Sequence, residues 1–231
     1  MTRPRPSPTL QRVLESAALL QDLVPDAVLV GGAAAALHAG HPESLDHDHV
    51  LTDLAERYAD VIDAVEASDG WATSVRASKP PMTLLGPLGG VQAGLRQLRR
   101  RRPLETESIE VAPGRHVVVP TAPETLRVKA YLVVQRNQVR DYLDVVALAD
   151  HLGPEAAVDV LRNIDSYYVD RSGEEGSVLT ALVEALADPT PLDVDVTREL
   201  PRYRGLSERW HDWSTVTAAC SELAARLVGV W

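Results

Sequence analysis

The sequence has few of the residues on which disulfide-stabilised, zinc-binding or membrane-spanning proteins depend. Its single cysteine, Cys220, excludes an internal disulfide and a zinc site built from cysteines. One cysteine fits a reducing compartment, so we expect a cytoplasmic protein. No apolar run reaches the roughly 18 residues of a membrane-spanning helix. Residues 1–8 combine charge and proline without a following apolar stretch, which favours a flexible N-terminal tail over a signal peptide.

Basic residues are outnumbered, and almost all of them are arginine. The formal net charge is −10, which argues against a protein that coats nucleic acid non-specifically. Of 23 basic residues only Lys79 and Lys129 are lysines. A cluster of five arginines nevertheless falls within residues 96–102. This cluster could guide an RNA, and it could equally be a solvated edge between a strand and a loop.

The hydrophobic pattern predicts an α+β fold with two parts. Apolar spacing predicts helices over 9–24, 33–39 and 53–68, and strands over 27–30, 45–51, 71–76, 90–98, 106–111 and 115–119. After residue 120 the pattern is helical, over 122–136, 138–152, 155–163, 177–187 and 207–229. Alternating strands and helices followed by a run of strands imply a mixed sheet. We therefore expect a mixed β-sheet core over 9–120, and a helical region over 121–231 that completes a cleft.

Asp46 and Asp48 are the first residues that point to chemistry. In a strand, residues two apart point to the same face with Cα atoms roughly 6–7 Å apart. Carboxylates that close repel each other unless a cation lies between them, and hard oxygen ligands suit Mg²⁺ or Mn²⁺. The alternative is an acidic pair at a solvated strand end.

Two glycines and a serine accompany this pair. Gly31 and Gly32 follow a buried strand and precede an expected helix, where backbone N–H groups can approach a phosphate closely. Ser44 adds a hydroxyl that could bind phosphate. Without the aspartates, an ordinary strand-to-helix turn and a simple turn residue would explain these three positions.

Together these residues resemble the nucleotidyltransferase superfamily. Its pattern is a hydrophobic residue, Gly-Gly or Gly-Ser, a spacer, and then Asp-hydrophobic-Asp; here Val30-Gly31-Gly32 is followed after 13 residues by Asp46-His47-Asp48. More narrowly, residues 29–38 and 44–48 look like the AbiEii/AbiGii-type toxin branch of type IV toxin–antitoxin systems. The resemblance covers roughly residues 27–152. It implies a nucleotidyltransferase fold that binds a nucleoside triphosphate with Mg²⁺ or Mn²⁺.

Two later motifs extend the resemblance into the helical region. A lysine in the expected helix 122–136, Lys129, would meet the triphosphate charge as a compact ammonium. Asp141 would assist catalysis, by ordering Lys129, by helping to bind metal, or as a base on the acceptor hydroxyl. Arg140 is an additional candidate for nucleotide binding. Asp144 lies four residues after Arg140, so a surface ion pair between them is the simpler interpretation of that acid.

The sequence also departs from the family pattern. His47 and His49 stand where aliphatic residues are usual, on the face opposite the carboxylates. They could form a two-histidine metal pair as in cupins, but an all-β barrel does not fit a chain that is half helical. We expect them to face a polar or partly open layer. A third carboxylate is not obvious; Glu110, in an expected strand, is a weak candidate.

The resemblance implies a Mg²⁺-dependent transfer of a nucleoside monophosphate from an NTP to an acceptor hydroxyl. Asp46, Asp48, Lys129 and Asp141 would be catalytic, with the two strand aspartates holding the metal. The implied acceptor is RNA, such as tRNA, and an antitoxin protein is a possible partner; no membrane is expected. The alternative is a catalytically inactive nucleotide-binding or protein-interaction module on the same fold.

Overall fold

The computed structural model describes residues 6–39, 44–100, 102–168, 176–203 and 205–229. The first five residues of the expected tail lie outside these ranges, and the first helix, α1, begins at Pro8. The chain folds into two compact units. The sheet unit comprises Met1–Leu37, Glu43–Arg99 and Pro103–Thr121, and the helical unit comprises His38–Pro42, Arg100–Arg102 and Ala122–Trp231.

A four-stranded mixed sheet forms the centre of the sheet unit. The strand order is β1-β2-β4-β3, in which β2 and β4 are parallel and the two outer pairs are antiparallel. A separate hairpin pairs β5 with β6. The strands are β1 (Val28–Val30), β2 (Asp46–Leu51), β3 (Thr83–Leu88), β4 (Val91–Gln97), β5 (Thr106–Ala112) and β6 (Arg115–Pro120).

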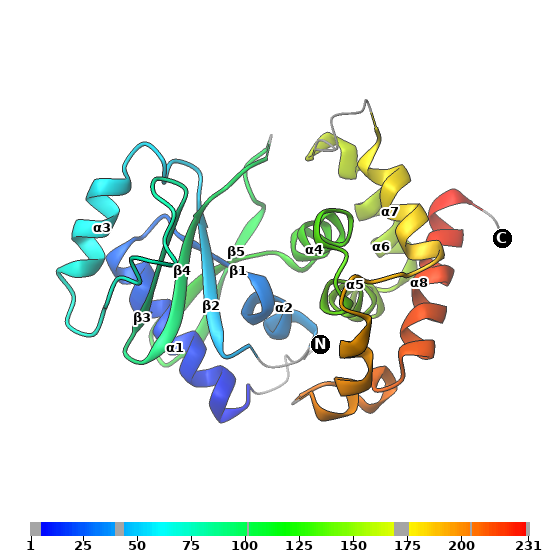
Figure 1. The fold of residues 1–231 in the computed structure, drawn as a ribbon, viewed down its shortest axis with the longest axis horizontal. Helices are drawn as coiled ribbons and strands as arrows, with labels where there is room; N and C mark the ends of the chain where they lie inside the picture. Colours follow the sequence, from blue (N-terminus) through cyan, green and yellow to red (C-terminus); the bar gives the residue numbers. More distant parts are fainter. Residues whose placement is uncertain (1–5, 40–43, 101, 169–175, 204, 230–231) are drawn as a thin grey trace. The chain divides into compact units, whose positions relative to one another are not determined.

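Helices α1 (Pro8–Leu23) and α3 (Tyr58–Glu66) cover one face of this sheet, and Figure 1 shows them beside it. The Ser7 hydroxyl accepts the N–H of Leu10 and caps α1, with Pro8 in the first turn. Leucines and valines of both helices pack on alternate residues of β2, β3 and β4. Residues of β2, β3 and β4 whose side chains point to the opposite face of the sheet take no part in this core. Helix α2 (Gly31–Ala39) follows β1 directly.

The helical unit packs its helices around apolar stripes, and Figure 1 labels α4 to α8. Helix α5 ends at Gly153, while Asp212 accepts the Ser214 N–H at the start of α8. The helices are α4 (Ala122–Arg136), α5 (Val139–Leu152), α6 (Pro154–Arg162), α7 (Val178–Ala187) and α8 (Trp213–Val228), with 3₁₀ turns at Ile164–Ser166, Val194–Arg202 and Glu208–Trp210. None of the helices in the described ranges has both the length and the apolar character that crossing a membrane requires.

The predicted fold class is confirmed, whereas one strand prediction is wrong. Residues 71–76 form no strand; Trp71 makes only an isolated bridge to Leu88. The edge strand of the sheet is instead β3, Thr83–Leu88. Its Gly86 and Pro87 interrupt the alternation of apolar and polar residues by which a strand is predicted. Gly86 is required there because a Cβ would lie 2.6 Å from the Ala72 carbonyl oxygen. The expected helix over 53–68 is shorter and begins at Tyr58.

Candidate functional site

Asp46 and Asp48 lie on the sheet face that α1 and α3 leave uncovered. They begin β2, where the parallel neighbour β4 places Gln92 beside Asp46 and Gly94 beside Asp48. Both carboxylates line a pocket of about 280 Å³, together with Ser74 on the connection before β3. The pocket lies within the sheet unit, so its geometry depends on that unit alone.

Two glycines make room for the Asp48 carboxylate. A Cβ on Gly94 would lie 2.5 Å from Asp48 Oδ1 and 2.9 Å from Leu85 Cδ2, so no other residue fits there without displacing a neighbour. Gly31 has a φ of +76° and a Cβ there would lie 3.7 Å from Asp48 Oδ2. The strand-to-helix turn therefore lies against the carboxylate, and the first turn of α2 begins at that place.

Each aspartate has one polar neighbour that orients it. The Ser44 hydroxyl donates to Asp46 Oδ1 at 2.6 Å, so this buried serine positions the acid. Arg96 on β4 donates its Nε–H to Asp48 Oδ1 at 3.2 Å. The Arg96 side chain is 48% exposed and that of Asp48 is 36% exposed, so the pair is open to solvent.

The histidines face the core instead of the polar or partly open layer that we expected. His47 and His49 are both fully buried, because α1 and α3 cover their side of β2. The Ser16 hydroxyl donates to the Leu88 carbonyl, so His47 Nε2–H donates to Ser16 Oγ at 3.0 Å. The two Nδ1 atoms are 3.5 Å apart. In the described part of the chain, His49 Nε2 has no hydrogen-bond partner.

This burial keeps both imidazoles uncharged. Desolvation lowers the pKa of His47 to about 4, although Asp46 opposes the shift. The pKa of His49 is lowered well below its ordinary value by burial and then by His47. Both side chains are therefore neutral core residues at physiological pH.

The donor set on the open face fits a hard divalent cation. Two carboxylates on one strand face offer oxygen ligands, and the missing Cβ of Gly94 leaves Asp48 room to turn. Among the described residues, no group of three or more His, Cys, Asp or Glu could hold a metal ion. Bound Mg²⁺ commonly takes one or two carboxylates and completes its shell with phosphate oxygens and water. Asp46 and Asp48 could therefore hold a metal together with a phosphorylated ligand.

In the helical unit, Lys129 and Asp141 each have an ion-pair partner. Lys129 Nζ lies 2.5 Å from Asp144 Oδ2, and both side chains are nearly fully buried. The expected pair between Arg140 and Asp144 is thus replaced by one with Lys129. Asp141 Oδ1 accepts from Arg136 at 2.6 Å, and burial raises the pKa of Asp141 although Arg136 and Lys129 oppose it.

Arg140 and Glu110 have simpler surroundings. Arg140, near the start of α5, is half-buried, and within the described ranges its side chain forms no ion pair. Glu110 on β5 is exposed and accepts the Gly114 N–H at 3.0 Å, which stabilises the β5–β6 turn. Glu110 therefore has a local structural role. The roles of Lys129, Asp141 and Arg140 in catalysis or nucleotide binding stay predictions.

The arginine cluster does not form one exposed track. Arg100 is completely buried as a side chain, and it and Arg127 both bind Glu124. Arg102 stacks over the ring of Tyr167, 5.0 Å from its centroid. Arg101 lies outside the described residues. Among the described arginines of the cluster, Arg96 lines the pocket and Arg99 is exposed, both in the sheet unit, whereas Arg100 and Arg102 belong to the helical unit.

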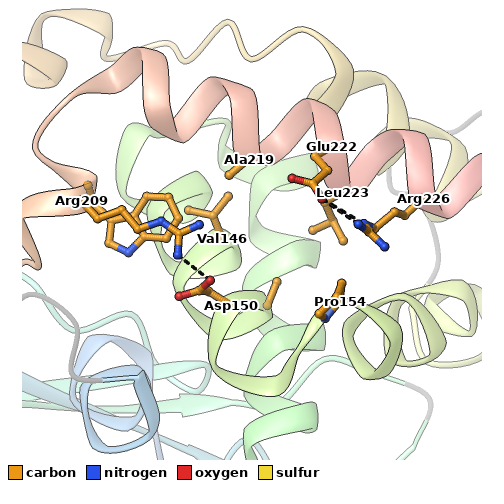
Figure 2. Close-up of a pocket in the computed structure, with 10 residues that line it drawn as sticks. Val146, Asp150, Pro154, Arg209, Ala219, Glu222, Leu223 and Arg226 are labelled. Carbon is orange, nitrogen blue, oxygen red and sulfur yellow. Dashed lines mark hydrogen bonds and ion pairs between the residues drawn. The ribbon is translucent and has the colours of Figure 1, made fainter. Parts of the chain in front are cut away.

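A second cavity, of about 190 Å³, lies among α5, α6, α8 and the preceding 3₁₀ turn (Figure 2). Its apolar wall includes Val146 and Leu223, both buried. Arg209 binds Asp150 at 2.6 Å at one end, and Arg226 binds Glu222 at 2.8 Å at the other. Figure 2 shows these two ion pairs on either side of the apolar side chains. No predicted site residue contributes to this cavity.

Sequence reasoning missed Gly94 as a residue of the pocket, and it considered Arg96 only as part of the arginine cluster. Gly94 is an isolated glycine within a strand pattern, which often marks the close approach of another group. Arg96 follows two residues later and therefore shares its face. The sequence could not show that these residues lie beside Asp48, because β2 and β4 become neighbours only when the chain folds.

The fold is similar to that of solved nucleotidyltransferase structures. The structure of the MenT4 nucleotidyltransferase toxin from Mycobacterium tuberculosis aligns with a TM-score of 0.59 and 15% identity, over 96% of this chain and 84% of that one. JHP933 from Helicobacter pylori aligns with a TM-score of 0.52 and 13% identity, over 96% and 94% of the two chains. A further H. pylori structure, provisionally assigned as a nucleotidyltransferase, gives 0.51 and 12%, over 96% of each chain. At these identities the likeness establishes the fold; the AbiEii branch stays a prediction.

Sequence comparison leads to a different set of proteins. The heme uptake protein MmpL11 of M. tuberculosis is 32% identical over 209 residues, which cover 82% of this chain and 20% of that protein. The mycolic acid-containing lipids exporter MmpL11 of Mycolicibacterium smegmatis is 34% identical over 132 residues, covering 57% and 13%. The chain thus spans a fifth or less of the length of these curated relatives. No family profile matches the sequence.

Proposed function

We propose that this chain is a nucleotidyltransferase that binds a nucleoside triphosphate with Mg²⁺ or Mn²⁺ at the pocket of β2 and β4. The observation that carries the proposal is the placement of Asp46 and Asp48 on the open sheet face, with Gly31 against Asp48. A pocket of about 280 Å³ has room for part of a nucleotide. The turn at Gly31 lies beside the Asp48 carboxylate, although Gly31 and Gly32 are not among the residues that line the pocket.

In this proposal each residue has a distinct task. Asp46 and Asp48 supply the negative oxygens, and Ser44 holds Asp46 in orientation. Gly31 and Gly32 offer backbone N–H groups to phosphate oxygens at the start of α2. A metal held by Asp46 and Asp48 would neutralise phosphate charge and polarise the reacting phosphoryl group. Lys129 and Asp141 are proposed as further catalytic residues on the family resemblance alone; in this structure Lys129 pairs with Asp144.

The proposed acceptor is a hydroxyl of RNA. Its support is the family resemblance and the likeness to a nucleotidyltransferase toxin. The division of the arginine cluster removes one argument for RNA, since Arg100 is buried inside the helical unit. An antitoxin partner is proposed on the resemblance alone, and a cytoplasmic location on the single cysteine.

Binding and transfer can be tested with one pair of variants. Asp46→Asn combined with Asp48→Asn should abolish Mn²⁺-dependent binding of NTP, measured by calorimetry, because both metal carboxylates are lost. Asp60→Asn combined with Asp63→Asn removes the same charge from the exposed face of α3 and should leave binding intact. Equal binding by both double variants would refute the site. Incubation of the wild type with each α-labelled NTP and total RNA then tests transfer.

A second candidate is a nucleotide-binding or protein-interaction module without transferase activity. It is favoured by the ion pair of Asp48 with Arg96 and by the match to a fifth or less of longer transport proteins. Under this hypothesis the chain serves a transport system by binding nucleotide or protein. NTP binding without transfer to RNA or protein, with all four nucleotides and both metals, would favour this module.

A further inference from the structure

Asp48 has two oxygens with different surroundings. Oδ1 is directed to β4, where it accepts from Arg96 at 3.2 Å and occupies the space that a Cβ of Gly94 would fill. Oδ2 is directed to the glycine turn, where a Cβ of Gly31 would lie 3.7 Å away. One oxygen is thus engaged by a guanidinium, and the other is beside the proposed phosphate-binding backbone.

Arg96 is the cation that lines this pocket among the described residues. The other charged side chains that line the pocket are those of Asp46 and Asp48. The formal charge of the lining is therefore about −1, which is weak attraction for a bare divalent ion. A free metal ion must also compete with Arg96 for Asp48 Oδ1.

The guanidinium can leave Asp48 at little cost. Its side chain is 48% exposed, and ion pairs this open to solvent contribute little to stability. Arginine can bind phosphate oxygens with two parallel N–H groups, whereas its contact with Asp48 uses the Nε–H alone. A metal–triphosphate complex offers Asp48 a new cation and Arg96 a new anion at the same time.

We propose that Arg96 is a positioning residue that makes metal binding depend on the nucleotide. It neutralises Asp48 in the empty pocket and moves to the phosphates when a metal–triphosphate complex enters. This inference rests on the proposed function, because it assumes that the pocket of β2 and β4 accepts that complex. If Arg96 were only a solvated strand residue, its removal would not change the coupling between the two ligands.

The test measures Mn²⁺ affinity by electron paramagnetic resonance, with and without the non-hydrolysable analogues of ATP and GTP that carry an α,β-methylene bridge. In the wild type, either analogue should tighten Mn²⁺ binding by about fivefold or more, a usual size for coupling between ligands. In Arg96→Gln, Mn²⁺ alone should bind more tightly and each analogue more weakly, so the coupling should fall. Arg96→Lys should keep part of it, since an ammonium retains the charge without the planar geometry.

Arg115→Gln is the matched control, because Arg115 is exposed on β6 and lies outside the pocket. It should behave as the wild type, and thermal melts should show that all variants remain folded. Equal coupling in Arg96→Gln and the wild type would overturn the role of Arg96 while leaving the proposed function standing. A wild type that binds neither analogue with Mn²⁺ would overturn both proposals.

Discussion

The two faces of strand β2 carry polar residues in strict alternation, yet the sheet unit treats them in opposite ways. Asp46 and Asp48 line an open pocket, while His47 and His49 are enclosed between the sheet, α1 and α3. On the closed face, burial keeps the imidazoles uncharged. On the open face, the Asp48 side chain is partly exposed to solvent and contacts Arg96 of the neighbouring strand β4. Whether helices pack on a strand face therefore decides, more than residue type does, which polar side chains can bind a ligand.

The largest expected effect is a loss of folding stability at low pH, caused by the two buried histidines of the closed face. The pKa of His47 is lowered from 6.5 to about 4, so the unfolded chain binds more protons between these values. Stability is therefore complete above about pH 6.5 and falls as the pH drops, by about 3 kcal/mol at pH 4 for this residue. His49 acts in the same direction. Urea unfolding at pH 7, 5.5 and 4.5 measures the slope.

His47→Gln is the control for that slope, because glutamine can still donate to Ser16 and does not titrate. Its unfolding free energy should vary less with pH than that of the wild type. If the two proteins lose stability in parallel, the acid sensitivity arises elsewhere.

An intermediate effect is expected from filling the space beside Asp48. In Gly94→Ala the new methyl would lie 2.5 Å from Asp48 Oδ1, so the carboxylate or β4 must shift. Overpacking of this kind costs roughly 1–3 kcal/mol, and the displaced acid should also bind metal and nucleotide more weakly. Chemical unfolding and calorimetry measure the two losses. Gln92→Ala, on the same face of β4, should leave stability nearly unchanged; a similar loss there would mean that the face is generally intolerant.

The smallest change in stability should follow Asp48→Asn, although this residue is central to the proposed site. Its ion pair with Arg96 is half exposed, and such pairs contribute about 0–1 kcal/mol. The melting temperature should therefore change little while metal-dependent binding is lost. A large drop in melting temperature would instead identify Asp48 as a structural residue of the sheet.

Much of the sheet unit could be predicted because its signals are local. The apolar run before Gly31 and the alternation through Asp46–Leu51 each predict a strand without reference to partners. The strand at Thr83–Leu88 could not be predicted in this way. Pro87 and Gly86 weaken its pattern, and its place beside β4 is stabilised by pairing that the sequence does not display.

The residues of the candidate site likewise differ in whether local spacing could predict them. Spacing alone places Asp46 and Asp48 on one face of a strand and the glycines at the turn before α2. It could not show that Gly94 and Arg96 accompany Asp48, since these residues come from a strand more than 40 positions later. It also could not show that Lys129 pairs with Asp144, which requires the packing of α4 on α5.

By itself, the sequence determined the α+β class, the helical character after residue 120, and an acidic pair set against a glycine turn, because each depends on short-range periodicity and turn chemistry. Only the tertiary structure decided which face of β2 is covered, which arginine of the cluster reaches the pocket, and which acid Lys129 meets. Those outcomes depend on strand order, register and helix packing, in which residues far apart in the chain compete for the same space.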